Sequence, residues 1–259
     1  MKTLYFLIIL LNFSHCAIAQ NTVDSPFSQK RMRKDLTTFK KIREAANSGI
    51  YKYKTPAEID SIYRWAVSEI GHSDTYLDFY NILCKITDFE GSLHNDTYLP
   101  EKLKELLKAE KTGYFKYTIK LIEGKMLINF KNGEIPLGAE ILAINDKKIT
   151  SILPNLYKYY GTDGVNISGK SIGINKRFSI YFRMHYGSKN EFRVSYKIPS
   201  EEGSRNITLN SVGYNTYFKN FNKRHSINFD SLSYDLTLNK IIKGKEPYNF
   251  ELISDKVAK

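Results

Sequence analysis

The spacing of apolar residues changes once along this chain, near residue 112, and the change separates two kinds of predicted structure. Before it, apolar residues recur three and four positions apart, which places them on one face of an α-helix. The pattern predicts four helices. The first carries Leu36, Phe39, Ile42 and Ala46 and ends at Gly49, and the second runs from Pro56 to Ile70 between Thr55 and Gly71. The third begins at Asp74 or Thr75, and the fourth runs from Glu101 to Lys111 after Pro100. Short connections join these helices, so residues 35–111 are expected to form a helical domain.

After residue 112 the apolar positions alternate with polar ones, as in strands that have one buried face. Tyr117, Ile119 and Leu121 lie on one such strand, and Glu123-Gly124 is a two-residue hairpin turn before the return strand. The further predicted elements are the return strand through Met126, Ile128 and Phe130, a buried strand at Ile141–Ile144 followed by a turn, a helix at Ser151–Tyr160 with a proline in its first turn, a helical insertion around Ile172–Tyr186, and paired strands at Phe192–Tyr196 and Asn206–Leu209.

Together these elements predict an α+β fold, with a small N-terminal helical domain followed by a β-rich domain that carries a helical insertion. The expected division of the chain is a signal peptide at 1–20, a flexible segment at 21–34, the helical domain at 35–111, the β-rich domain at 112–212 and a linker at 213–259. The linker is predicted because Tyr214 to Tyr248 is polar and aromatic with weak periodicity.

The first twenty residues have the pattern of an export signal. Lys2 supplies a positive start, Thr3 to Phe13 is almost wholly apolar, and Ala17-Ile18-Ala19 is typical of a cleavage site. The apolar run is shorter than the ~20 residues that a transmembrane helix needs. A lipid anchor on Cys16 normally requires a small residue directly before the cysteine, but this position is occupied by His15. We therefore expect an exported protein, periplasmic or secreted, with no transmembrane segment; Cys84 is then its one cysteine and a small buried residue.

Composition narrows the class of protein. With 259 residues, 42% hydrophobic and 25% charged, the chain is not collagen-like, disulfide-rich or disordered as a whole. Its 39 basic and 27 acidic residues give a formal net charge of +12. The basic residues are dispersed rather than clustered, and an exported protein rarely meets nucleic acid. The charge therefore predicts a solvated basic face and no nucleic-acid partner.

Neither a metal site nor a cofactor site is predicted. His72 with Asp74 and His94 with Asp96 are spaced two apart, but the chain has no His-x-x-x-His and no cysteine pair. Ser188-Lys189 lacks the Gly-x-Ser-x-Gly pattern of a nucleophile elbow. Ser188 and Lys189 are expected to be surface polar residues and His94 a hydrogen-bonded turn residue, so no catalytic residue is assigned.

Two stretches of the chain resemble the tail-specific (C-terminal-processing) serine peptidase family. The first comprises Asp35-Leu36-x-x-Phe39, Gly49-Ile50-Tyr51-x-Tyr53, Phe79-Tyr80 and Gly91-Ser92-Leu93-His94 up to Leu99-Pro100, where relatives usually have Gly-His-Thr; Leu93 and Asn95 depart from that pattern. The second comprises Gly113-Tyr114-Phe115, Glu123-Gly124-Lys125 and Ile135-Pro136-Leu137-Gly138-Ala139-Glu140-Ile141-Leu142-x-Ile144-Asn145-x-Lys147, which is similar to the PDZ-like domain of that family. Their order and spacing extend over about 170 residues.

The resemblance implies a PDZ-like domain at 112–212 that takes an extended polypeptide as an added strand and holds its terminal carboxylate in a turn of N–H groups. The residues expected to bind it are Gly113, Tyr114, Phe115 and Lys116 of the turn, Tyr117 and Ile119 of the edge strand, and Leu156 and Tyr160 of the facing helix. The alternative is that these aromatic residues fill the core of the domain.

The family's catalytic domain, with its serine and lysine, has no counterpart after Phe250. The resemblance therefore implies the non-catalytic N-terminal part of an exported serine peptidase, from a truncated gene or with a separate chain supplying the active site. A free-standing periplasmic peptide-binding adaptor is the alternative.

Overall fold

The computed structural model describes residues 22–93, 97–131, 133–224, 252–254 and 257–258. The chain divides into a unit at Met1–Lys223 and a second at Arg224–Lys259. The second unit contains an antiparallel hairpin of β7 (Leu252–Ser254) and β8 (Val257–Ala258). The predicted signal peptide with Cys16, and most of the predicted linker, lie outside the described residues. None of the described helices combines the length and the apolar character needed to cross a membrane.

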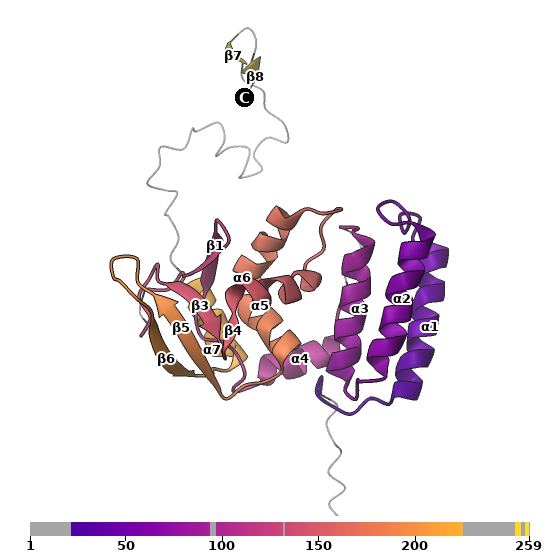
Figure 1. Ribbon diagram of the computed structural model, residues 1–259, viewed down its shortest axis with the longest axis horizontal. Helices are drawn as coiled ribbons and strands as arrows, with labels where there is room; N and C mark the ends of the chain where they lie inside the picture. Colours follow the sequence, from indigo (N-terminus) through magenta and orange to yellow (C-terminus); the bar gives the residue numbers. More distant parts are fainter. Residues whose placement is uncertain (1–21, 94–96, 132, 225–251, 255–256, 259) are drawn as a thin grey trace, which may run out of the picture. The chain divides into compact units, whose positions relative to one another are not determined.

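Of the helices at the N-terminal end of the chain, all but the first begin where local sequence signals predict. They are α1 (Gln29–Ala46), α2 (Pro56–Ile70), α3 (Tyr76–Glu90) and α4 (Glu101–Ala109), of which the first three lie side by side in Figure 1. Thr55 caps α2 and Thr75 caps α3, each in a reciprocal pair with an acidic side chain three residues later. Gly91 ends α3 in the left-handed conformation, with φ at 70°. The four predicted helices are confirmed, except that α1 begins at Gln29 rather than near Asp35.

The segment predicted to be flexible, 21–34, is ordered from residue 22. Val23 accepts a hydrogen bond from the N–H of Leu77 at 2.7 Å and is buried, and Pro26 forms a bridge with Thr75. Residues 29–34 are the first turns of α1, because Met32 is fully buried between neighbouring helices. The inward face of α1 is therefore shifted toward its start, and Ile42, expected inside, is 58% exposed.

The second half of the described chain contains a six-stranded sheet in the order β1-β2-β3-β5-β6, with β4 paired to β3. Every pair is antiparallel. The strands are β1 (Ile119–Ile122), β2 (Lys125–Ile128), β3 (Glu140–Ile144), β4 (Lys147–Lys148), β5 (Glu191–Lys197) and β6 (Arg205–Asn210). Glu123 and Gly124 both have positive φ, at 50° and 78°, as a tight hairpin turn requires. The predicted hairpin and the predicted pairing of the last two strands are confirmed.

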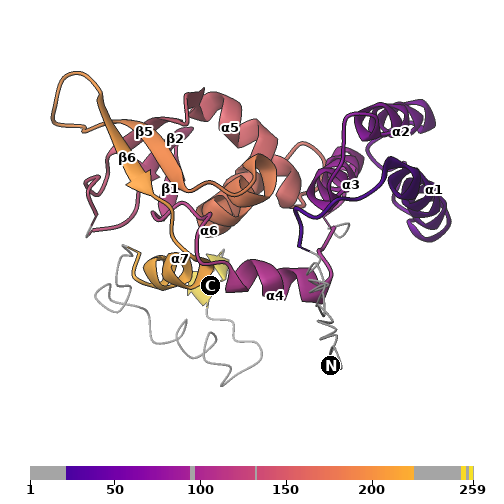
Figure 2. The same cartoon turned by 90° about the horizontal axis from the view of Figure 1, so that it is seen from below.

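Two helices fill the space between the sheet and the N-terminal helices (Figure 2). They are α5 (Ile149–Leu156), continued by the short η1 (Tyr157–Tyr159), and α6 (Ile167–Tyr186). Their apolar side chains share one core with the inner face of the sheet. The proline expected in the first turn of a helix from Ser151 lies inside α5 instead, because that helix already begins at Ile149.

A further helix, α7 (Tyr214–Asn222), corrects the prediction of a linker from residue 213. Tyr217 is buried and its ring stacks on Tyr114 at 6.3 Å. The N–H of Tyr214 donates to the carbonyl of Glu110 at 3.2 Å, which places the start of α7 beside the end of α4. The fold of the described chain is α+β, with N-terminal helices followed by an antiparallel sheet, as the sequence predicts.

Candidate peptide-binding edge

Strand β1 forms one edge of the sheet, and in the described chain only β2 pairs with it. In an antiparallel ladder, successive residues direct their backbone groups alternately to the two sides of the strand. The N–H of Leu121 donates to Oδ1 of Asn175 on α6 at 2.6 Å, so Leu121 is one of the residues that face outward. Ile119 lies two residues earlier on β1, so its backbone N–H and carbonyl groups face the same side. This outer side of β1, together with α6, is the candidate edge for an added strand.

The surroundings of this edge combine exposed apolar and basic side chains. Ile172 on α6, one turn before Asn175, is 49% exposed, and Lys120 on β1 is exposed. Lys176 and Arg177 on α6 are exposed as well. A strand added here would therefore meet an apolar contact and three positive charges.

Most of the predicted binding side chains lie in the protein interior. Phe115, Tyr117, Ile119 and Leu156 belong to the core beneath the sheet, each with 2% or less of its surface exposed. Tyr114 is equally buried, and its hydroxyl donates to the carbonyl of Leu107 at 3.0 Å. These five side chains are not available to a ligand, so a peptide at this edge would be held by backbone groups.

Tyr160, the other helix residue proposed to line the groove, is half-buried and packs onto α6. A Cβ added to Gly173 would lie 2.4 Å from Cγ of Tyr160, which shows how closely the ring covers that glycine. The structure thus brings Tyr160 to α6 and Leu156 to the core below, rather than to one open groove wall.

The predicted carboxylate-binding turn uses its donors within the protein. The N–H of Gly113 donates to Oγ of Ser211 at 3.1 Å, and the N–H of Tyr114 donates to the carbonyl of Val212 at 3.0 Å. Gly113 has φ at 102° and its Cβ position is filled by the Oγ of Ser188 at 2.6 Å. The expectation that these two N–H groups face an open anion site is therefore wrong; they fasten the start of this segment to the chain after β6.

Lys116, expected to assist a carboxylate of the ligand, already has a carboxylate partner in the protein. Its ammonium pairs with Glu134, whose second carboxylate oxygen accepts a hydrogen bond from the Tyr117 hydroxyl at 2.7 Å. Lys116 first, and Tyr117 second, lower the pKa of Glu134 to about 2. This pair holds the loop before β3 against the segment that leads into β1.

This pair predicts the titration of Glu134. Above its ordinary pKa of 4.5 the ionised carboxylate stabilises the fold, and that contribution is lost as the pH falls toward about 2. Lys116→Ala should raise the pKa of Glu134 toward its ordinary value, measured from side-chain carboxyl NMR shifts across a pH titration. Lys120→Ala, which removes an exposed lysine on β1, should leave the pKa of Glu134 unchanged. Equal shifts in the two variants would contradict the pairing.

The key contact of this edge could not be found from sequence. Asn175 lies on a helix whose apolar pattern identifies the buried face but does not say which strand that face meets. Ser211 and Val212 are likewise separated from Gly113 and Tyr114 by about a hundred residues, and no local pattern links such positions.

Within the described residues, no group of three or more His, Cys, Asp and Glu side chains is placed to hold a metal ion. No family model matches the sequence, and no curated protein matches it. Among solved structures, the chain is similar to the crystal structure of mature CPAF, with 14% sequence identity and a TM-score of 0.45. The likeness covers 70% of this chain and 34% of that chain, so this chain spans about a third of that protein's length.

Proposed function

We propose that this protein recognises polypeptides by adding an extended segment to the outer edge of β1, beside α6. In this proposal it is the non-catalytic N-terminal part of an exported serine peptidase of the tail-specific family, acting through a PDZ-like groove. The observation that carries the binding step is the hydrogen bond from the Leu121 N–H to the side-chain amide of Asn175.

That hydrogen bond has the geometry of a strand contact made by a side chain. Leu121 directs its N–H to the side of β1 opposite β2. On that side, the carbonyl of a further strand would accept the hydrogen bond. The amide oxygen of Asn175 accepts it instead at 2.6 Å. Exchanging one acceptor for another costs little, because the net value of such a bond is only about 1 kcal/mol. An incoming strand can therefore displace Asn175 and gain further backbone bonds along β1.

Charge suggests which polypeptides this edge would select. Lys120, Lys176 and Arg177 are exposed around it, and in the described chain none of the three has a carboxylate partner within salt-bridge distance. Extended segments with acidic side chains would be attracted, and their binding would weaken as salt is added. Apolar side chains on the same segment would meet Ile172.

The proposal is tested with a fluorescent peptide of alternating valine and glutamate, measured by anisotropy against the purified protein. Leu121→Pro should weaken binding by about tenfold or more, because proline removes the outward N–H and its ring blocks close approach. The β1–β2 ladder keeps its bonds, since this N–H does not face β2. Asn175→Ala should strengthen binding about fivefold, because the competing acceptor is gone.

Two controls distinguish strand addition from non-specific peptide binding. Asn222→Ala changes an exposed asparagine on α7 and should leave the affinity unchanged. A second peptide, N-methylated at alternate residues so that it cannot pair on one side, should bind at least about tenfold more weakly than the first. Equal affinity for the two peptides, or normal binding by a folded Leu121→Pro variant, would refute strand addition at β1.

The alternative, a free-standing periplasmic adaptor, uses the same edge. The peptidase-part hypothesis and the adaptor hypothesis are distinguished by the DNA sequence downstream of the gene and by assays of casein cleavage. A serine-peptidase domain encoded nearby, whose product cleaves casein faster when this protein is added, supports the first. Peptide binding with no such partner supports the adaptor. Hydrolysis of casein by this protein alone would contradict both.

A further inference from the structure

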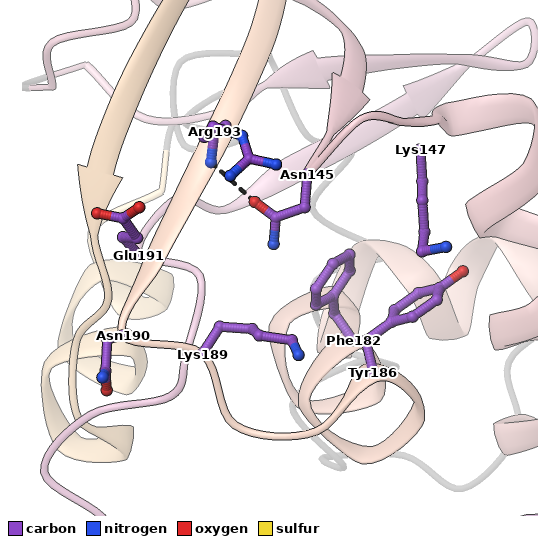
Figure 3. Close-up of a pocket in the computed structure, with 8 residues that line it drawn as sticks. All are labelled: Asn145, Lys147, Phe182, Tyr186, Lys189, Asn190, Glu191 and Arg193. Carbon is purple, nitrogen blue, oxygen red and sulfur yellow. Dashed lines mark hydrogen bonds between the residues drawn. The ribbon is translucent and has the colours of Figure 1, made fainter.

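A pocket lies at the other end of α6 from the β1 edge. It has a volume of about 360 Å³, within the range of small-molecule sites. The turn after β3, the strand β4, the end of α6 and the start of β5 enclose it (Figure 3). Its lining residues are Asn145, Lys147, Phe182, Tyr186, Lys189, Asn190, Glu191 and Arg193.

The floor of the pocket is aromatic and held in place. Phe182 is a core residue, and its ring centroid lies 4.6 Å from that of Tyr186. The hydroxyl of Tyr186 accepts a hydrogen bond from the side-chain amide of Asn155 on α5 at 3.3 Å. Phe182 also packs edge-on against Phe192 at 5.7 Å. Phe182 is buried, so it supports the half-buried Tyr186 from below, and the ring of Tyr186 is the preformed apolar surface for a flat group.

The rim of the pocket is basic. Three cations and one carboxylate line it, a balance of +2. Arg193 is neutralised by Asp146, but Lys147 and Lys189 have no carboxylate partner among the described residues. In Figure 3 both lysine side chains extend toward the rings of Phe182 and Tyr186, whereas the carboxylate of Glu191 is directed away from them.

The turn that carries part of this rim is rigid. Asn145 and Asp146 both have positive φ, at 49° and 63°. Asn145 donates its N–H to the carbonyl of Arg193 and accepts the N–H of Arg193 on its side chain, each at 2.8 Å. Two hydrogen bonds to one residue of β5 fix the side of the pocket from which Lys147 projects. Lys147 and Lys189 thus stand on separate segments. Lys147 lies on β4 with its ammonium 5.8 Å from the centroid of the Tyr186 ring, and Lys189 lies in the loop between α6 and β5.

We propose that this pocket binds a carboxylate attached to an aromatic body, with Lys147 and Lys189 pairing the carboxylate and the half-buried Tyr186 contacting the ring. Two cations without a carboxylate partner, beside an exposed part of an aromatic ring, match an anionic head on a flat apolar group. The same chemistry occurs in a free aryl-substituted acid and at the C-terminus of a polypeptide that ends in an aromatic residue. The site is independent of β1 and does not require strand addition.

The test is an NMR titration of the purified protein with N-acetylphenylalanine, its uncharged amide, and a short peptide ending in phenylalanine with a free carboxylate. The free acid should shift the amide signals of Asn145, Lys189 and Arg193 to saturation, and the uncharged amide should bind at least about tenfold more weakly. An affinity for the peptide well above that for the free acid identifies a polypeptide end as the ligand. Equal affinities identify a small carboxylate.

Charge reversal supplies the matched controls. Lys147→Glu and Lys189→Glu should each weaken binding of the free acid by about tenfold. Lys148→Glu, which reverses an exposed lysine next along β4 that does not line the pocket, should change it by no more than about twofold. Non-saturating shifts, equal binding of acid and amide, or an equal loss in Lys148→Glu would overturn the proposal. The Leu121→Pro variant should bind the free acid normally. A failure of the pocket proposal can therefore be distinguished from a failure of strand addition at β1.

Discussion

Replacing Arg183 with methionine should lower the free energy of unfolding by about 3 kcal/mol, because the change leaves two carboxylates without their buried partner. The Arg183 side chain is 1% exposed, and its guanidinium donates to Glu110 at the end of α4 and to Asp24 near the N-terminus. Those carboxylates raise the pKa of Arg183 above its ordinary value despite its burial. One residue of α6 thereby joins the first described segment, α4 and the core around the sheet. Urea unfolding followed by circular dichroism measures the change.

Arg193→Met is the matched control for this buried arginine. Arg193 also pairs with a carboxylate, Asp146, but more than half of each side chain is exposed. Such a surface pair contributes at most about 1 kcal/mol, so the variant should unfold close to the unmodified protein. Adding Asp24→Asn and Glu110→Gln to Arg183→Met should restore part of the stability, because the uncompensated charges are then removed. Similar losses for the two arginine variants would contradict the role given to Arg183.

Phe115→Ala should destabilise the protein by about 3–5 kcal/mol, the usual cost of removing a buried phenylalanine ring. Phe115 is 1% exposed and its ring packs edge-on against Tyr117, Phe178 and Phe192, with centroids 5.9, 5.7 and 5.3 Å away. These rings come from the segment before β1, from α6 and from β5. Removing Phe115 leaves a cavity at the point where the three meet. The loss is measured from urea unfolding curves.

Phe218→Ala provides the comparison on an exposed surface. Phe218 on α7 is 48% exposed and stacks on Tyr214 at 6.2 Å, so its loss should cost less than about 1 kcal/mol. Equal destabilisation by the two changes would show that Phe115 is not a core residue. The expected result also means that Phe115→Ala is unsuitable for measuring peptide affinity, although the sequence had suggested it as a binding residue.

The helices could be predicted closely because their signals are local. Thr55-Pro56 before α2, Gly71 after it and Thr75 before α3 act on backbone groups within one turn. The β1–β2 hairpin is similar, since Glu123-Gly124 sets its turn and its register together. Errors appeared where local signals were weak. The prediction of a linker over α7 is wrong, because the stretch has weak periodicity and its helix is held by Tyr217 packing on Tyr114, a contact between distant parts of the chain.

The candidate sites depended still more on distant contacts. The sequence analysis placed Phe115 in a turn and Tyr117 and Ile119 on a strand, but it did not reveal that their side chains face the core below α6. It also left the partners of Gly113 and Tyr114 undetermined, and these lie after β6. The Asn175 contact at the β1 edge joins two segments that are distant in the sequence, and the pocket around Lys147 and Lys189 joins several.

By itself, the sequence determined the class of fold, the order of helices and strands and most of their ends, because capping residues, tight turns and apolar periodicity act over a few neighbouring residues. Only the tertiary structure decided which backbone donors and which cations have partners. That outcome depends on which distant segments pack together, and packing follows from the shapes of whole buried faces rather than from any short stretch of residues.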